Sequence, residues 1–156
     1  MNSGLPRLYR SSGKRGHLSE IAADARHIAA RKLVREVQVQ FAYRDAIVHT
    51  PEGQVHARPG DAILTGIAGE HWRVSRAHFG DKYQPVPPTR AGESGTYVSL
   101  PNRILALRMK EPFDVLLADG ISRLSGRAGD WLVDYGDGSL GIVTDAIFAI
   151  TYEVSD

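Results

Sequence analysis

The stretch from Arg58 to Tyr83 reads RPGDAILTGIAGEHWRVSRAHFGDKY, and a second stretch, from Arg127 to Tyr152, reads RAGDWLVDYGDGSLGIVTDAIFAITY. Aligned 69 positions apart and without a gap, the two stretches share eight of 26 residues, several times what chance matching gives. The shared residues, numbered in the first stretch, are Arg58, Gly60, Asp61, Gly69, Val74, Ala77, Phe79 and Tyr83. A repeat at a fixed spacing indicates two copies of one structural unit, so it decides the architecture.

Each copy begins with a turn. Gly60 and Gly129 precede short apolar runs, at positions where glycine reaches a positive φ without strain. A glycine-rich loop and a second apolar run follow in each copy, which predicts a β-hairpin. Ser75 and Thr144 then precede a short segment whose first helical turn they can cap. The pattern therefore predicts two small antiparallel β units with one short helix each.

Two aromatic rings end each copy. Phe79 and Tyr83, like Phe148 and Tyr152, are four residues apart. If the helical turn continues, both rings lie on one face and pack under the hairpin; if it ends, the tyrosine begins a closing strand. Ten residues form the structural motif of the two copies: Gly60, Asp61, Trp72, Phe79, Tyr83, Gly129, Asp130, Trp131, Phe148 and Tyr152.

The composition excludes several classes of protein. With 42% hydrophobic and 24% charged residues, the chain has the balance of a soluble globular protein. It contains no cysteine, which excludes disulfides, thiolate chemistry and zinc sites built from cysteine. There is no run of eighteen apolar residues, and the N-terminus lacks the apolar core of a secretory signal. We therefore expect a cytoplasmic protein with no membrane contact.

Charge is divided unevenly along the chain. Residues 1–36 carry eight Lys or Arg against three acidic residues, a balance of +5, so the other 120 residues carry a net charge of −4. Residues 1–17 hold few apolar side chains and are expected to form a basic flexible arm. Three roles stay open for this arm: a solvated tail, docking on a neighbouring subunit, or contact with nucleic acid. The net negative body disfavours nucleic acid as a partner.

Apolar residues recur at helical spacing after this arm. They are Leu18, Ile21, Ala22, Ala25, Ile28 and Ala29. Acidic residues lie in the early turns and basic residues in the late turns, which suits the helix dipole. The spacing and the charge order predict one amphipathic helix over residues 18–33, packed against a sheet or a partner chain.

Strand and loop signals divide the remainder of the chain. Val37, Val39 and Phe41 alternate with polar residues, which is the period of a half-buried strand. The sequence predicts a mainly β (α+β) fold made by tandem duplication of a small antiparallel unit. Its parts are a first β repeat over residues 34–86, a connector rich in proline and glycine over residues 87–102, and a second β repeat over residues 103–156.

The first copy also carries an ordered set of motif residues. They are Lys32-Leu33-Val34-Arg35-Glu36-Val37-Gln38, Glu52-Gly53, Pro59-Gly60-Asp61, Gly69-Glu70, Trp72, Val74, Phe79 and Tyr83. This order resembles the PGDYG-type family of small bacterial and phage proteins over residues 32–86 and again over residues 103–154, where Ala128 and Ser139 depart from it. The resemblance implies a small, largely β module of uncharacterised function that is common in phage and prophage genomes. It supplies no catalytic residue.

Few residues point to a ligand. Four arginines are expected to converge between the two copies, where guanidinium groups suit a phosphate; they are Arg58, Arg73, Arg76 and Arg127. Four histidines of the first copy are spaced seven apart in pairs, namely His49, His56, His71 and His78. Without helical His-x-x-x-His spacing or a flanking carboxylate pattern, they are interpreted as strand-surface residues and not as a metal site. Asp61 and Asp130 lie beside turn glycines and are expected to accept hydrogen bonds from the turn amides rather than to form an acid pair.

The sequence contains no nucleophile elbow, phosphate-binding loop or dinucleotide fingerprint. We therefore expect a non-enzymatic binding or scaffold protein of phage, prophage or bacterial origin, with no catalytic residue, metal or cofactor. A protein partner or self-association into a homo-oligomer is expected. The alternative is a protein that binds a small anionic, nucleotide-like ligand between the two repeats. An enzyme is the third interpretation and has the least support.

Overall fold

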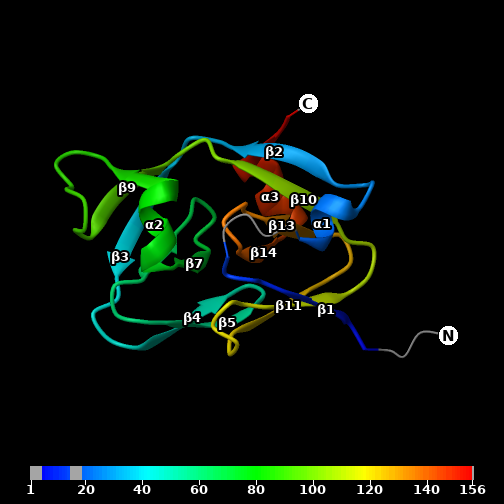
Figure 1. Cartoon of the computed structure of the whole chain (residues 1–156). Helices are drawn as coiled ribbons and strands as arrows, with labels where there is room; N and C mark the ends of the chain where they lie inside the picture. The colour runs from blue at the N-terminus through cyan, green and yellow to red at the C-terminus, as the bar shows by residue number, and fades with distance from the viewer. Residues whose placement is uncertain (1–4, 15–18, 156) are drawn as a thin grey trace. The chain divides into compact units, whose positions relative to one another are not determined.

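The computed structural model describes residues 5–14 and 19–155. Within these residues the chain forms fifteen strands and three short helices, so the fold is mainly β as predicted (Figure 1). The chain divides into two compact units. The central unit is Lys32–Asn102, and the terminal unit combines Met1–Arg31 with Arg103–Asp156. No helix of the described residues is long and apolar enough to cross a membrane.

The central unit is built on an antiparallel five-stranded sheet of order β7-β6-β3-β9-β8. Its strands are β3 (Glu36–Phe41), β6 (Ala62–Thr65), β7 (His71–Val74), β8 (Tyr83–Pro85) and β9 (Gly95–Ser99). A two-stranded hairpin adds β4 (Ala46–Thr50) and β5 (Gly53–Ala57), and the single helix is α2 (Arg76–Lys82). Figure 1 shows α2 as the green helix of this unit.

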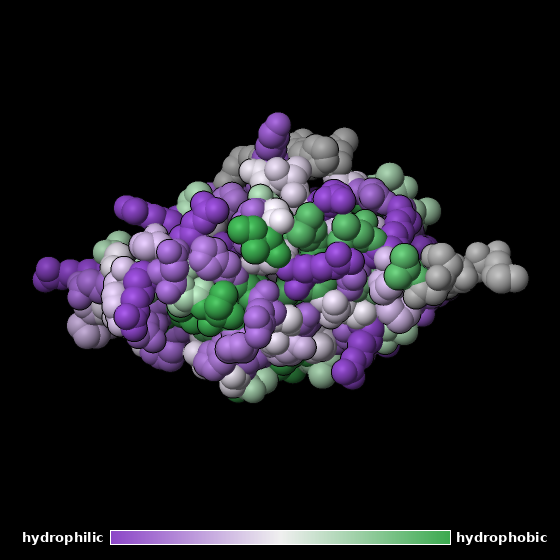
Figure 2. Space-filling model, turned by 90° about the horizontal axis from the view of Figure 1, so that it is seen from below, coloured by the Kyte–Doolittle hydropathy of each residue, from purple (hydrophilic) through white to green (hydrophobic). Residues whose placement is uncertain are grey.

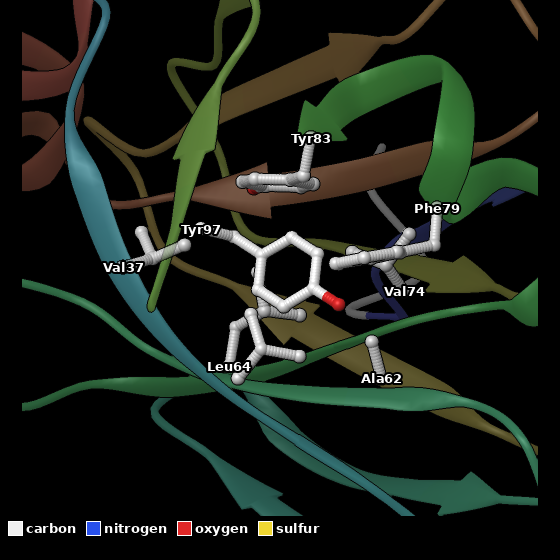
Figure 3. Packing of buried hydrophobic residues seen from close by; sticks show 8 residues of the cluster. Val37, Ala62, Leu64, Val74, Phe79, Tyr83 and Tyr97 are labelled. Carbon is white, nitrogen blue, oxygen red and sulfur yellow. The ribbon is translucent and has the colours of Figure 1, made fainter. Parts of the chain in front are cut away.

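Aromatic rings fill the core of the central unit. The helical turn ends at Tyr83, which begins β8, yet its ring still stacks on Phe79 at 5.2 Å and 14°. Tyr97 from β9 meets Phe79 edge to face at 5.0 Å and is 1% exposed. Figure 3 shows the Tyr97 ring among Tyr83, Phe79 and Leu64. The strand alternation predicted from sequence places Val37 and Val39 in the same core.

The terminal unit has a five-stranded sheet of order β14-β13-β10-β2-β15 and a three-stranded sheet of order β1-β11-β12. Its elements are β1 (Arg7–Arg10), α1 (Glu20–Ala23), β2 (Ile28–Lys32), β10 (Arg103–Arg108), β11 (Phe113–Leu116), β12 (Arg123–Gly126), β13 (Trp131–Asp134), β14 (Leu140–Val143), α3 (Asp145–Thr151) and β15 (Tyr152–Ser155). Phe148 and Tyr152 stack at 5.0 Å and 29° in its core, and Trp131 stacks on Phe148 at 4.1 Å and 9°.

The two five-stranded sheets have the same order of elements and the same register. Gln38 of β3 pairs with Thr65 of β6, and Leu105 of β10 pairs with Asp134 of β13. Gln38 and Leu105 are 67 positions apart, whereas Thr65 and Asp134 are 69 apart. The two extra residues lie in the turn between β11 and β12. The β4–β5 hairpin corresponds to the β11–β12 hairpin, and the offset is 67 for its first strand and 69 for its second.

The predicted amphipathic helix over residues 18–33 is wrong in most of its length. Only Glu20–Ala23 is helical, residue 18 lies outside the described residues, and Ile28–Lys32 is a strand. β2 lies between β10 and β15, and Ala30 there is fully buried. Two strand partners far away in sequence override the helical preference of an alanine-rich segment, because tertiary context outweighs propensity.

The expected flexible arm over residues 1–17 is also partly wrong. Arg7–Arg10 forms β1, which pairs in parallel with β11, and the Tyr9 ring is buried against Phe113 at 6.3 Å. Residues 1–4 and 15–17 of the arm lie outside the described residues. Tyr9 supplies enough apolar surface to hold this segment in the terminal unit.

The connector predicted over residues 87–102 contains a strand of the central sheet. β9 pairs with β3 on one side and with β8 on the other. The irregular part is therefore limited to residues 86–94 before β9 and residues 100–102 after it. The prolines and glycines mark this loop correctly but hide the short strand that follows it.

Candidate functional site

Asp61 is a buried carboxylate at the turn that opens the repeated stretch. The turn places Gly60 at a φ of 91°, and Asp61 Oδ2 accepts a hydrogen bond from the Arg58 amide at 2.9 Å. The Arg76 amide, at the start of α2, donates to Asp61 Oδ1 at 3.0 Å. Arg73 Nη1 forms a longer ion pair with Oδ2 at 3.4 Å. Asp61 thus fastens the turn to the helix, as expected of an aspartate beside a turn glycine.

The four predicted ligand-binding arginines fall into two groups. Arg58, Arg73 and Arg76 meet at Asp61 in the central unit, although Arg58 and Arg76 do so through their backbone amides. Arg127 belongs to the terminal unit, and its amide donates to Asp130 Oδ2 at 2.9 Å. The anion at which three of them meet is therefore a carboxylate of the protein itself. Among the described residues, the buried Arg73 Nε has no hydrogen-bond partner.

The corresponding turn of the terminal unit repeats part of this arrangement. Gly129 has a φ of 96°, and Asp130 accepts from its turn amide in the same way as Asp61. The start of α3 is capped differently, because the Thr144 hydroxyl accepts from the Ile147 amide, whereas Ser75 makes no such bond at the start of α2. Asp145 then accepts from the Trp131 indole at 2.9 Å.

Lys32, Trp72 and Tyr83 form a cluster that sequence reasoning did not identify as a site. Lys32 Nζ donates to the Tyr83 hydroxyl at 2.5 Å, and it lies 4.6 Å from the centre of the Tyr83 ring and 5.7 Å from that of Trp72. Burial lowers the pKa of Lys32 to about 8 and raises the pKa of Tyr83. Desolvation thus favours the neutral amine of Lys32, which lies beside two aromatic rings.

Lys32 ends β2, and the equivalent strand of the central sheet, β9, has no lysine at this position. At the offset of 67 that relates β2 to β9, Lys32 corresponds to Ser99. The Ser99 hydroxyl donates to the Leu33 carbonyl at 2.8 Å and accepts from the Arg35 amide at 3.0 Å, so it serves the backbone. The only sequence signal for the cluster was the basic residue that opens the family-like motif at Lys32.

The four histidines of the first copy do not gather. His71 contacts the Thr65 hydroxyl at 3.0 Å, His78 contacts the Ser75 hydroxyl at 3.2 Å, and His56 lies 3.4 Å from an oxygen of Asp45. In the part of the chain that the structure describes, no three His, Asp or Glu side chains are grouped so that they could hold a metal ion.

A cavity of about 290 Å³ lies in the terminal unit. Its lining includes Tyr9, Arg10, Ser19, Glu20 and Ile21. Glu20 forms an ion pair with Arg7, and the Ser19 hydroxyl donates to Asp134 at 2.5 Å. The polar groups around this cavity therefore hold β1 and α1 in place, which is a structural role.

Large apolar side chains remain exposed on both units. On the central unit they are Val34, Tyr43, Ile47 and Ile67, and on the terminal unit Leu5, Ile121, Ile150 and Val154. Figure 2 shows apolar side chains in separate groups between polar ones on the face it presents. Exposed apolar residues scattered in this way are common on protein surfaces and do not by themselves mark a binding site.

Comparison with known proteins gives one finding. The model of the family described as "PGDYG protein" matches residues 53–153, from β5 into β15, as a single match. The match therefore does not separate the two copies that the sequence pattern suggested. No curated protein and no solved structure gives a significant match.

Proposed function

The chain belongs to the PGDYG protein family, and we propose that it is a non-enzymatic binding or scaffold protein made by tandem duplication of one β module. The phage, prophage or bacterial origin implied by the family resemblance is part of this proposal. In this proposal each repeat begins one strand earlier than the predicted residues 34–86 and 103–156, so the first repeat spans residues 28–85 and the second spans residues 95–155.

The observation that carries the proposal is the agreement between the two five-stranded sheets. Replacing β7, β6, β3, β9 and β8 by β14, β13, β10, β2 and β15 turns one strand order into the other. A constant offset of 67 relates β2 to β9 and β3 to β10, and an offset of 69 relates the later strands. A register shared residue by residue supports a common origin of the two sheets, because a slip of one position would move every side chain to the other face.

Buried carboxylates support a structural role over a catalytic one. Asp61 accepts from two backbone amides, Asp114 forms an ion pair with Arg123 at 2.7 Å, and Asp134 accepts from the Gly136 amide. Arg123 contributes to a lower pKa for Asp114, against the effect of burial. Carboxylates tied in this way stabilise turns and strand ends and are not poised as general acids or bases.

A thermal-shift screen against nucleotides and divalent metal ions separates a scaffold or protein-binding role from the binding of a small ligand. A ligand present at a hundred times its Kd stabilises the folded state by about 2.7 kcal/mol, which raises the Tm measurably. We expect no ligand of these classes to raise the Tm. A reproducible, saturable shift with one nucleotide or metal would contradict the scaffold role and favour a small-ligand binder.

A small anionic ligand remains the second candidate, supported by the buried Arg73 Nε that has no partner within the described residues. Titration with inorganic phosphate, followed by Tm, tests it at this residue. If an anion binds there, Arg73→Lys removes the phosphate-dependent shift, because lysine lacks the planar fork of donors. Arg127→Lys is the matched control, since Arg127 lies in the other unit and should leave the shift unchanged.

A further inference from the structure

Each five-stranded sheet contains one strand from the other repeat. β2 precedes β3 in the chain but pairs with β10 and lies beside β15 in the terminal unit. β9 precedes β10 in the chain but pairs with β3 and β8 in the central unit. The first strand of each repeat is therefore exchanged reciprocally between the two sheets.

The exchanged strands supply core residues. Tyr97 of β9 contacts Phe41 at 6.0 Å and Phe79 at 5.0 Å in the central core. Ala30 of β2 is fully buried in the core of the terminal unit. Tyr9 and Ile21, which precede β2 in the chain, are also buried in the terminal unit. Without the other repeat, each sheet would lack the strand next to its central one and part of its core.

Short hinges join the exchanged strands to their own repeats. Residues 33–35 lead from β2 to β3, and residues 100–102 lead from β9 to β10. Each hinge is hydrogen-bonded to the strand that precedes the other hinge. The Lys32 amide at the end of β2 donates to the Asn102 carbonyl at 3.0 Å, and the Ser99 amide at the end of β9 donates to the Arg35 carbonyl at 2.9 Å. A three-residue connection is long enough for a local hairpin, but these bonds engage the hinge residues with the other hinge's strand and so favour the exchanged arrangement.

We propose that residues 1–91 and residues 92–156 bind each other as two strand-exchanging subunits do, each half holding an acceptor site for the first strand of the other repeat. The partner that fits either site is a second copy of the same repeat, in this chain supplied through the loop of residues 86–94. This inference rests on the proposed duplication and adds the means by which two copies assemble.

Cleavage of that loop tests the proposal in the full chain. A protease recognition sequence is inserted between the exposed residues Ala91 and Gly92, and the folded protein is cut and passed over a size-exclusion column. We expect the cut protein to elute where the uncut protein does and to separate into two fragments only in denaturant. Separation of the fragments in native buffer would overturn the proposal.

Engineered cysteine pairs distinguish strand exchange from any other association of the halves, since the chain has no cysteine of its own. Gln38 pairs with Thr96 across β3 and β9, and their side chains are hydrogen-bonded at 3.1 Å near the surface. Without exchange, β2 would take the place of β9, and Ala29 would lie opposite Gln38 instead. Gln38→Cys/Thr96→Cys is therefore matched by Gln38→Cys/Ala29→Cys, which shares one cysteine.

After oxidation and cutting, a non-reducing gel shows which fragments are linked. We expect Gln38→Cys/Thr96→Cys to give one linked band and Gln38→Cys/Ala29→Cys to give two bands. Ala29→Cys/Leu105→Cys, across β2 and β10, should also give one band and reports on the other sheet. Two bands for the first pair, together with an intrafragment disulfide for the second, would overturn the exchange. A ligand found in the thermal-shift screen would overturn the proposed function and leave this result unaffected.

Discussion

The two five-stranded sheets hold the same stacked Phe–Tyr pair but cover it from different strands. In the central unit, Tyr97 of β9 contacts Phe79, and the equivalent position in the terminal unit is Ala30. In the terminal unit, Trp131 of β13 stacks on Phe148, and the equivalent position in the central unit is Ala62. Each core thus combines one large and one small residue at these two positions: Tyr97 with Ala62 in the central unit, and Trp131 with Ala30 in the terminal unit.

This difference shows that two cores of the same strand order can be filled by different residues. Protein interiors are close-packed, so a ring added on one strand must be offset by volume removed nearby. Phe41 contacts the central rings and corresponds to Arg108, which forms an ion pair with Asp145 at the start of α3. The Phe–Tyr pair and the Gly-Asp turn are the constant features, and the covering ring is the variable one.

The largest expected effect is at the constant ring. Phe79→Ala and Phe148→Ala should each lower the free energy of unfolding by about 3–5 kcal/mol, because each removes a buried ring and leaves a cavity. Urea denaturation with two spectroscopic probes measures the loss. A midpoint near that of the wild type for either variant would show that its ring is not a core residue of its unit.

Moving the covering ring should sharpen the comparison. Ala62→Trp alone should cost about 1–3 kcal/mol, since it overpacks a core already filled by Tyr97. In the Tyr97→Ala background, which imitates Ala30, the same tryptophan should cost less or stabilise. A double-mutant cycle in urea measures this coupling. Additive effects would mean that a ring at position 62 does not compete with Tyr97 for the same volume of the core.

The turn glycines should respond less strongly and unequally. Gly60→Ala and Gly129→Ala both place a side chain at positive φ, which costs about 1–2 kcal/mol. A Cβ at Gly60 would also come within 2.8 Å of Arg76 Cδ, whereas a Cβ at Gly129 meets nothing within 4 Å. We therefore expect the larger loss at Gly60, measured by denaturation midpoints. A larger loss at Gly129 would contradict the geometry of the two turns.

The last prediction concerns pH. Burial holds the pKa of Lys32 at about 8, below the value of about 10.4 in an unfolded chain. Between these two values the unfolded chain binds more protons than the folded one, so the contribution of Lys32 to stability rises with pH. Below pH 8 both states are protonated and the cost of burying the charge is fully present.

The free energy of unfolding, followed from about pH 7 to about pH 10.5 for wild type and Lys32→Met, measures this contribution. The wild type should gain stability relative to the variant across this range. Lys110→Met, at an exposed lysine, is the matched control and should run parallel to the wild type. A constant difference between wild type and Lys32→Met would show that Lys32 is not desolvated.

Local chemistry explains why the turns and strand pattern could be predicted. Gly60 and Gly129 adopt positive φ, Asp61 and Asp130 accept from the turn amides, and Val37 and Val39 are buried in one core. Each of these features depends on residues within a few positions of one another, so the sequence pattern is sufficient to indicate it.

The Lys32 cluster could not be predicted in the same way. Lys32, Trp72 and Tyr83 are separated by up to 51 residues, and each has a common structural explanation when it is considered alone. The lowered pKa of Lys32 is a property of its burial, and burial is decided by packing. A basic residue at the start of a motif carries no local sign of this.

By itself, the sequence determined the repeated Gly-Asp turn, the hairpin that follows it, the aromatic pair four residues apart and the mainly β class. Tertiary structure alone decided which strands complete the sheets. Ile28–Lys32 has helical spacing and Gly95–Ser99 follows a proline- and glycine-rich loop, yet both are strands next to the centre of a sheet. The physical reason is that a strand is stabilised by its neighbours, and β10 beside β2 and β3 beside β9 both lie far along the chain.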